Sequence, residues 1–404
     1  MKDIAGLELA TVQRAVAAVG IESDDVSVIA DAFARAAWST IIEPGDRLAG
    51  VIIDQLGAEL ALRHVIQRTL PLELSHVVSG QNSDDLAAAL ERWVPRLNAA
   101  DALLALQRAA AVGAFLLVPQ MPRWPRGLRD IGPHQPVVLW GRGQRDALDG
   151  FERSIAIVGA RASTGYGEHV TMELTAGLVD RKVSIVSGAA YGIDGMAHRS
   201  ALATEGTTMA FMAGGVDRFY PSGHDALLGR IIESGVVLAE TPCGFAPTKW
   251  RFLQRNRLIA AASQATVVVE AGWRSGSLNT ANHAASMGRP LGAVPGPITS
   301  ASSAGCHRLL REYDAVCVTT AGEVAELISF DQPEGSEPRA NTLVLEFSSQ
   351  ATRVLDSLAP RKQRSVDELA RISGLSVREV ATALGELELE QRATMRERGW
   401  CLSS

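Results

Sequence analysis

Hydrophobic residues recur at helical spacing through the first quarter of the chain. Alanine, leucine and valine return every three or four positions in three segments: Leu7–Val19, Val26–Trp38 and Leu48–Ile66. This spacing predicts amphipathic helices. The most apolar window, Ala102–Val118, is interrupted by Gln107 and Arg108, so it predicts a buried helix rather than a membrane span. We therefore expect a helical N-terminal domain over residues 1–112.

After this region the pattern changes to short β-branched runs that alternate with amphipathic helices. The candidate strands are Ser154–Val158, Val183–Val186, Thr207–Met212, Val236–Ala239, Thr266–Glu270, Leu291–Val294 and Ala315–Val318. Nearly continuous apolar strands separated by helices indicate a mostly parallel sheet that is covered on both faces. We expect this α/β core to span residues 113–330.

The last part of the chain predicts a small, separate module. A polar stretch rich in proline and glycine, Asp331–Pro338, predicts a linker over residues 331–345. Beyond it, Ser365 and Ser376 are each followed three residues later by glutamate, a capping-box pattern that opens a helix. A terminal hairpin follows these two helices. Helix, turn, helix and hairpin together predict a winged helix over residues 346–404.

The charge of the chain bears on its possible partners. The 404 residues carry 39 Lys plus Arg against 45 Asp plus Glu, a net charge of −6, and an acidic total normally argues against nucleic-acid binding. Residues 1–110 hold 9 basic and 15 acidic residues, and this balance of −6 equals the whole deficit. Residues 111–330 hold 20 and 18. A nucleic-acid partner of the α/β core therefore stays open.

Cysteine usage and the N-terminus indicate the compartment. The four cysteines are widely spaced and form no Cys-x-x-Cys pattern, which is typical of a reduced protein without a zinc knuckle. The first residues lack the basic and apolar regions of a signal peptide. We expect a soluble cytoplasmic protein with no membrane partner.

Two glycine-rich loops follow neighbouring candidate strands. Ser154–Val158 runs into Gly159–Gly167, and the next strand runs into Ser187–Asp194. Backbone N–H groups and helix N-termini in such loops suit a phosphate, and the two loops would meet at the C-terminal edge of the sheet. The spacing matches neither GxGxxG nor GxxxxGK[ST], which argues against a dinucleotide cofactor and a P-loop. Two tight turns without a ligand remain the alternative, with Asp194 as a helix N-cap.

The strongest chemical signal is a cluster of cations and aromatic rings over Lys249–Arg257. Four cations and two aromatic residues in nine positions supply phosphate partners and a base-stacking surface. The alternative is a helix start whose arginines pair with Glu240, Glu270 or the surface. Downstream, Ser275, Gly276 and Ser277 again follow a strand and open a helix.

Searches for catalytic motifs find none. The chain holds no GxSxG and no HExxH, and its eight histidines are scattered, so no metal ligand set and no nucleophile–base pair stands out. Glu270 is expected to orient an arginine rather than to perform acid–base chemistry. We predict a binding protein with no cofactor, rather than an enzyme.

These motifs, taken together and in order, resemble those of the DprA/Smf DNA-processing family. The shared motifs are Gly159-Ala-Arg161 with Tyr166-Gly167, Ser187–Asp194, Gly214–Pro221, Arg255–Ala260, Val268–Glu270, Ser275–Ala281, Gly288-Arg289 and Val294–Gly296. The resemblance implies an extended Rossmann-like core, a helical N-terminal domain of the SAM or helix-hairpin-helix kind, and a winged-helix tail. It also implies a homodimer that binds single-stranded DNA, protects it and loads the RecA recombinase during transformation or recombination.

The same resemblance implies roles for individual residues. Arg161, Lys249 and Arg257 would contact phosphates, and Phe252 would stack on a base. The backbone and hydroxyls near Ser163, Ser187 and Ser275 would hold the strand. The full candidate set is Gly159, Arg161, Ser163, Ser187, Gly188, Lys249, Phe252, Arg255, Asn256, Arg257, Ser275, Gly276 and Ser277. One stretch departs from the family pattern, at Gly305–Ala315, and Asn279 replaces an expected isoleucine, which bears most on dimer geometry and the RecA contact.

Two other functions stay open. The first is a nucleotide phosphoribohydrolase of the lysine-decarboxylase-like group, although the Pro-Gly-Gly-x-Gly-Thr-x-x-Glu loop of those enzymes is missing after Glu270. The second is a double-strand DNA regulator that acts through the winged helix. Its candidate recognition helix, Val377–Gln391, carries Arg378 among four glutamates, which fits protein contact better than a major groove.

Overall fold

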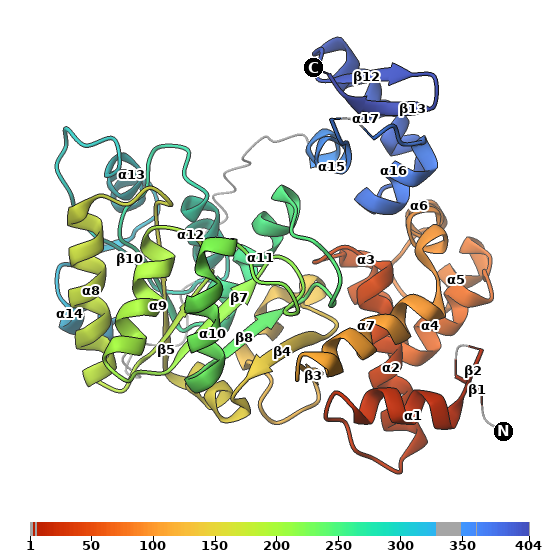
Figure 1. Ribbon diagram of the computed structural model, residues 1–404, viewed down its shortest axis with the longest axis horizontal. Coiled ribbons are helices and arrows are strands. Elements are labelled where there is room, and N and C mark those ends of the chain that lie inside the picture. Colours follow the sequence, from red (N-terminus) through yellow and green to blue (C-terminus); the bar gives the residue numbers. More distant parts are fainter. Residues whose placement is uncertain (1–2, 5, 329–348, 361, 404) are drawn as a thin grey trace.

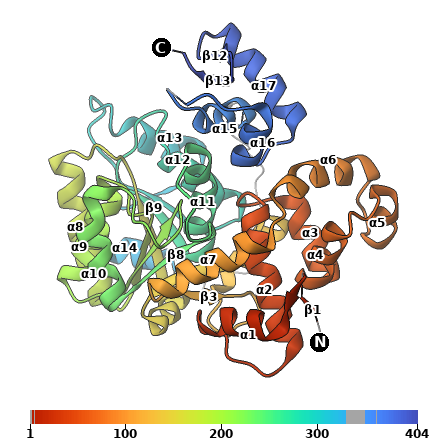
Figure 2. The same cartoon turned by 45° about the vertical axis from the view of Figure 1, so that its right-hand side comes forward.

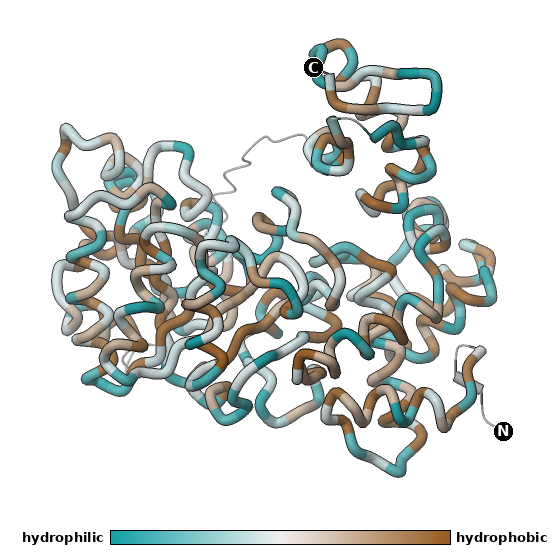
Figure 3. Tube along the Cα trace, viewed as in Figure 1, coloured by the Kyte–Doolittle hydropathy of each residue, from teal (hydrophilic) through white to brown (hydrophobic). Residues whose placement is uncertain are grey.

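The computed structural model describes residues 3–4, 6–328, 349–360 and 362–403. It places a helical N-terminal part beside an α/β core, with a small C-terminal module against both (Figures 1 and 2). Hydrophobic stretches follow the central strands and inner helices, and hydrophilic stretches follow the surface loops (Figure 3). Within the described ranges, no helix is both long and apolar enough to span a membrane.

The N-terminal part consists of helices packed around buried apolar side chains. After a short hairpin, β1 (Asp3–Ile4) and β2 (Leu7–Glu8), come α1 (Leu9–Ala17), α2 (Val26–Ile41), α3 (Arg47–Leu56), α4 (Ala58–Ile66), α5 (Pro71–Val77), α6 (Ser83–Trp93) and α7 (Ala99–Ala111). Helix α2 forms the centre, because its Phe33 and Trp38 are fully buried, and the Trp38 ring meets Trp93 edge-on at 5.2 Å.

Two predictions in this region are wrong in detail. The segment Leu48–Ile66 forms two helices rather than one, because Gly57 between α3 and α4 has a φ of 78°, which a helix cannot accommodate. The apolar window Ala102–Val118 holds only part of a helix. Helix α7 ends at Ala111, and β3 (Phe115–Leu117) then enters the sheet of the core.

The core is a nine-stranded sheet, and its Rossmann-like, mostly parallel character confirms the predicted fold class. The remaining strands are β4 (Leu139–Gly143), β5 (Ser154–Val158), β6 (Ser184–Ser187), β7 (Thr208–Met212), β8 (Val236–Ala239), β9 (Ala265–Val268), β10 (Leu291–Ala293) and β11 (Val316–Cys317). The order is β11-β10-β9-β5-β6-β7-β8-β4-β3. Neighbouring strands from β11 to β8 are parallel, and β4 and β3 extend the sheet as antiparallel strands.

Helices cover both faces of this sheet, as continuously apolar strands require. Helices α8 (Gly165–Asp180), α9 (Ile193–Ala203) and α14 (Ala321–Glu326) pack on the face that holds Ile155 and Ile157. Helices α11 (Lys249–Ala262), α12 (Ser277–Ser286) and α13 (Ala304–Glu312) pack on the face that holds Ala156 and Val158. Helix α10 (Asp225–Ser234) packs near β8.

The C-terminal module is a winged helix, as predicted. It comprises α15 (Ser349–Ser357), α16 (Val366–Ser373), α17 (Val377–Leu389), β12 (Ala393–Arg396) and β13 (Gly399–Leu402), around its own apolar core. Ser376 and Glu379 form a complete capping box, and Gly374 ends α16 in the left-handed conformation. The predicted linker, residues 331–345, lies outside the described residues.

Candidate nucleic-acid interface

A hollow of about 520 Å³ lies at the point where the strand order of the sheet reverses. Strand β5 pairs with β6 on one side and with β9 on the other. From β5 the chain adds β6, β7 and β8 on one side, and it later adds β9, β10 and β11 on the other side. Such a reversal leaves a crevice at the carboxyl ends of the strands, where open α/β sheets bind ligands. The loop after β5, the loop after β9 and the helix α11 line the hollow.

The loop after β5 is built by glycine and braced by a carboxylate. A Cβ at Gly159 would lie 2.6 Å from Ile193 Cγ1 and 2.9 Å from the Glu270 carbonyl oxygen, so only glycine fits this approach. Thr164 donates from its backbone N–H and its hydroxyl to Glu270, at 2.9 and 2.6 Å. The Ser302 hydroxyl donates to the same carboxylate at 3.2 Å. The expectation that Glu270 orients an arginine is therefore wrong, because its oxygens tie two loops together.

Polar groups of the loop after β6 are used inside the protein. The buried Ser187 hydroxyl donates to the Ile157 carbonyl at 2.6 Å, and the Gly188 N–H donates to Asp194 Oδ2 at 3.1 Å. Burial raises the pKa of Asp194, while Arg255 and backbone N–H groups oppose that rise. Asp194 lies within the first turn of α9, which begins at Ile193 after Gly192, so it is not the predicted N-cap.

Two arginines of α11 are committed to buried ion pairs with the rest of the protein. Arg257 Nη2 donates to both oxygens of Glu240 at 2.8 and 2.7 Å, and the arginine is only 3% exposed. Arg251 donates to both oxygens of Glu43 on the N-terminal part, at 2.9 and 2.8 Å. Arg257 and Arg251 therefore follow the alternative given for this cluster, in which its arginines pair with carboxylates of the protein.

Glu43 joins three parts of the molecule. Besides Arg251, it accepts from Arg96 Nη2 at 3.0 Å, and Gly374 of the winged helix packs against it closely enough that a Cβ there would lie 2.7 Å from Glu43 Cγ. Burial alone would raise the pKa of Glu43, but the charges of Arg251 and Arg96 outweigh burial and lower the pKa to about 2.

Arg255 lines the hollow, but one of its guanidinium nitrogens donates to two backbone carbonyls and another donates to Asn256 Oδ1. Its Nη1 donates to the carbonyls of Gly188 and Phe211, each at 2.6 Å. Burial lowers its pKa to about 10; Asp194 opposes the shift and the nearby charge of Arg161 adds to it. Arg255 is thus a buried support beneath the hollow.

Two exposed arginines face the hollow from opposite loops. Arg161 follows β5, and its guanidinium carbon lies 5.2 Å from the ring centre of Phe252. Arg274 follows β9. Neither arginine forms an ion pair within the part of the chain that the structure describes. Phe252 is half-buried, lines the hollow and packs on Tyr220 at 5.4 Å.

The loop after β9 is tied to α11 by Asn256. The Asn256 amide donates to the Gly276 carbonyl and to Asn279 Oδ1, both at 3.3 Å. The hydroxyls of Ser275 and Ser277 lie 2.8 Å apart. Asn279, which departs from the family pattern, therefore takes part in fixing the loop at the edge of the hollow.

The structure brings together eight of the thirteen predicted site residues. These eight line the hollow: Gly159, Arg161, Phe252, Arg255, Asn256, Ser275, Gly276 and Ser277. The other five do not line it: Ser163, Ser187, Gly188, Lys249 and Arg257. Sequence reasoning missed Arg274 and Ser302. Arg274 stands beside the predicted Ser275, and its place in the loop that follows a predicted strand was the available signal.

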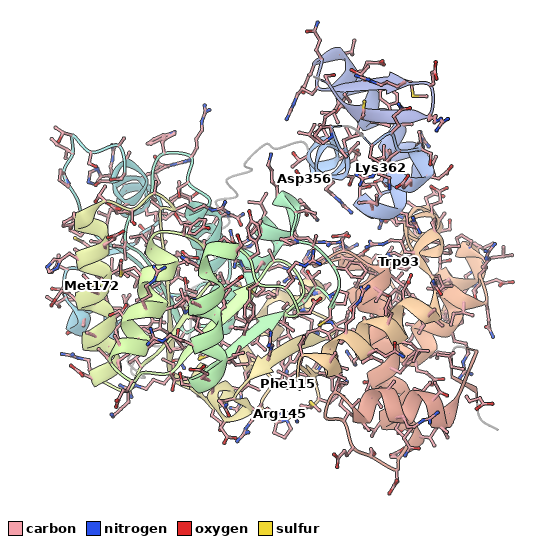
Figure 4. All side chains as sticks on the ribbon, in the orientation of Figure 1. Trp93, Phe115, Arg145, Met172, Asp356 and Lys362 are labelled. Carbon is pink, nitrogen blue, oxygen red and sulfur yellow. The ribbon has the colours of Figure 1, made fainter. Side chains whose placement is uncertain are left out.

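Two of these five residues lie near the hollow without lining it. The Ser163 hydroxyl donates to Glu168 at 2.9 Å in the loop after β5. Lys249 opens α11 with an exposed side chain, and its backbone N–H donates to Asp356 Oδ2 of the winged helix at 2.7 Å. Asp356 lies on the side of the winged helix that faces α11 (Figure 4). The described residues form no cluster of three or more possible metal ligands.

Comparison with known proteins assigns the chain to a family. Residues 115–329 match the family model of DNA recombination-mediator protein A, and residues 335–396 match that of the DprA winged helix domain. The chain belongs to the DNA recombination-mediator protein A family. The resemblance drawn from the sequence motifs is thereby confirmed, and the protein is a DNA-processing recombination mediator.

Individual relatives agree with this assignment. The chain is 43% identical over 345 residues to the putative DNA processing protein DprA of Mycobacterium tuberculosis, covering 82% of this chain and 87% of that one. It is 37% identical over 263 residues to protein Smf of Escherichia coli, covering 63% and 68%. The X-ray structure of DprA from Streptococcus pneumoniae superposes with a TM-score of 0.59 at 29% identity, covering 73% of this chain and 96% of that chain.

Proposed function

We propose that the hollow at the strand-order reversal binds single-stranded DNA. Arg161 and Arg274 contact phosphates from the two opposing loops, and Phe252 stacks on a base. One observation carries this proposal: two exposed arginines, which form no ion pair with the described residues, flank a half-buried aromatic ring at the carboxyl edge of the sheet. Base stacking combined with cations along the backbone is the common means of binding single strands without sequence preference.

The shape of the hollow favours a single strand over a duplex. Phe252 is recessed among Arg161, Arg255 and Tyr220, so a base must leave its pair and its stack to reach the ring. A paired base inside a duplex offers its edges to a protein but not its face. Lys249, exposed at the start of α11, extends the positive surface toward the winged helix.

The bound strand is passed to a recombinase. We infer that the protein acts in the cytoplasm as a homodimer, protects single-stranded DNA and loads RecA onto it. Membership of a recombination-mediator family supports this role. Light scattering of the purified protein tests the dimer, and a RecA filament-assembly assay on DNA coated with a single-strand binding protein tests the loading.

The hollow binds its ligand without chemical turnover. Asp194, a carboxylate that lines the hollow, is buried, accepts the Gly188 N–H and lies near the charge of Arg255. Glu270, which does not line the hollow, accepts three hydrogen bonds that brace the loops. Incubation with nucleoside monophosphates should therefore release no free base. Release of base with turnover would replace this proposal with a phosphoribohydrolase.

The decisive experiment is a titration of labelled single- and double-stranded oligonucleotides of the same length at two salt concentrations. Wild-type protein should prefer the single strand, and its affinity should fall with salt by a logarithmic slope of about −0.7 per neutralised phosphate. Equal affinity for both forms, or an affinity unaffected by salt, would contradict the proposal.

A further inference from the structure

A large aromatic side chain stands exposed at the rim of the hollow and has no part in the roles assigned above. Trp273 lies between Gly272 and Arg274, both of which line the hollow. The tryptophan itself is 57% exposed. An indole in water forgoes the stabilisation that burial would give it, so this position invites a ligand that covers the ring.

One neighbour of Trp273 is a cation that fixes the orientation of the ring. The Arg308 guanidinium carbon, from α13, lies 5.0 Å from the indole ring centre. Arg308 is itself held by Glu312, at 2.8 Å, and its side chain is only 15% exposed. A ring that is oriented before binding loses less conformational freedom when a ligand stacks on it. The exposed part of the ring remains available for that ligand.

The backbone around Trp273 is also fixed. The Ala271 N–H donates to the Ser302 carbonyl at 2.8 Å, and the Gly305 N–H donates to the Ala271 carbonyl at 2.7 Å. On the other side of the tryptophan, the Ser275 N–H donates to the Gly272 carbonyl at 3.0 Å. Trp273 therefore stands on a short turn anchored at both ends.

The same turn is tied to the helix that carries Phe252. Asn256, one helical turn beyond Phe252, donates to the Gly276 carbonyl. Gly276 is three positions after Trp273, which limits their Cα separation to about 11 Å. Arg274 lies next to the tryptophan in the chain and lines the hollow. Phe252 and Arg274 thus line the hollow, and Trp273 stands in the chain between two of its lining residues.

We propose that Trp273 is a second base-stacking residue, which takes a nucleobase of the same single strand whose neighbouring base stacks on Phe252. Arg274 then contacts the phosphate between the two nucleotides. This inference rests on the proposed single-strand site and extends it, because it makes the strand cross the hollow from α11 to the loop after β9.

The test compares the affinities of wild type and three variants for single-stranded oligonucleotides. Trp273→Ala should weaken binding by roughly 5- to 150-fold, the range that corresponds to the loss of one stacking residue. Trp273→Phe should restore most of that loss, because it retains a flat ring. Val316→Ala serves as the matched control, since Val316 is an exposed apolar residue on β11 at the edge of the sheet. It should bind as wild type does.

A second readout separates stacking from a structural effect. On an oligonucleotide whose nucleotides in the bound region lack bases, wild type and Trp273→Ala should bind equally, because no base is left to stack. A difference that persists on this strand would overturn the proposal. So would wild-type affinity of Trp273→Ala for the normal strand.

Two further outcomes distinguish failure of the Trp273 role from failure of the proposed single-strand site. If Arg161→Ala weakens binding and Trp273→Ala does not, the hollow binds DNA but Trp273 is not a second base-stacking residue. If neither variant weakens binding, the proposed single-strand site itself fails. Light scattering is run on every variant, and a change of oligomeric state in Trp273→Ala with unchanged DNA affinity would assign the indole to a protein contact instead.

Discussion

The cations on the two sides of helix α11 differ in burial and in the element that carries them. On one side, Arg251 and Arg257 are buried and paired with Glu43 and Glu240. The other side faces the hollow, where Phe252 meets Arg161, an exposed residue from another loop. The buried cations join the helix to the N-terminal part and to the sheet, whereas the exposed Arg161 forms no ion pair with the residues that the structure describes and is the cation proposed to contact phosphate. The density of cations along α11 is therefore a poor guide to which of them are accessible, because two of its arginines are already paired inside the protein.

The largest expected effect comes from breaking the buried pair at Arg257. Arg257→Ala leaves Glu240 buried without its partner, which should lower the free energy of unfolding by about 3–5 kcal/mol. Urea unfolding monitored by circular dichroism measures this loss. A variant as stable as wild type would show that the pair does not support the fold.

The stability contributed by the buried ion pairs of Glu43 should depend on pH. Its pKa is about 2 in the folded protein against 4.5 for a free glutamate. A lowered folded pKa contributes stability that is complete above pH 4.5 and is lost as pH falls toward 2, in total about 3 kcal/mol. Glu43→Gln should be less stable at pH 7 and should lose less stability across that window. If the free energy of unfolding fell equally in wild type and in Glu43→Gln between pH 6 and pH 3, the result would contradict this account.

On the exposed side, Phe252→Ala should act on binding. Loss of the stacking ring should cost about 1–3 kcal/mol of single-strand affinity. Phe252→Tyr keeps the ring and is the matched control. Fluorescence anisotropy with a labelled oligonucleotide measures the affinity of both variants. Equal affinities of Phe252→Ala and Phe252→Tyr would show that Phe252 does not stack on a base.

The smallest effect is expected where the winged helix meets α11. Asp356 accepts the backbone N–H of Lys249, so Asp356→Ala removes one acceptor at a helix N-terminus and should cost about 0.5–1 kcal/mol of stability. Asp356→Asn keeps an acceptor and should lose less. A thermal melt separates the two variants, and a loss as large as that of Arg257→Ala would give the winged helix a greater structural role than we infer.

The strands of the sheet were predicted well from the sequence, whereas the partners of the arginines of α11 were predicted poorly. All seven predicted strands exist, because continuous β-branched runs leave few alternatives. The antiparallel strands β3 and β4 were missed, since Trp140-Gly-Arg-Gly143 lacks β-branched residues. The winged helix was predicted from its serine caps and its hairpin.

Side-chain pairing depends on contacts that local patterns do not contain. Glu43 and Arg251 are 208 positions apart, so no motif around the arginine could reveal its partner. The loops of the hollow were predicted because each follows a strand, and parallel strands end at one edge of a sheet. Which cations remain free at that edge required the folded structure.

The measurement that tests the central claim most directly is single-strand affinity at two salt concentrations for one exposed and one buried cation. Arg161→Ala should weaken binding about tenfold or more and reduce the salt slope by about 0.7. The double variant Glu240→Gln, Arg257→Met removes the buried pair without changing the net charge, and the introduced amide keeps an oxygen for the Gly45 N–H that Glu240 now binds. Its affinity and slope should match wild type. The reverse result, loss in the double variant and none in Arg161→Ala, would contradict the account.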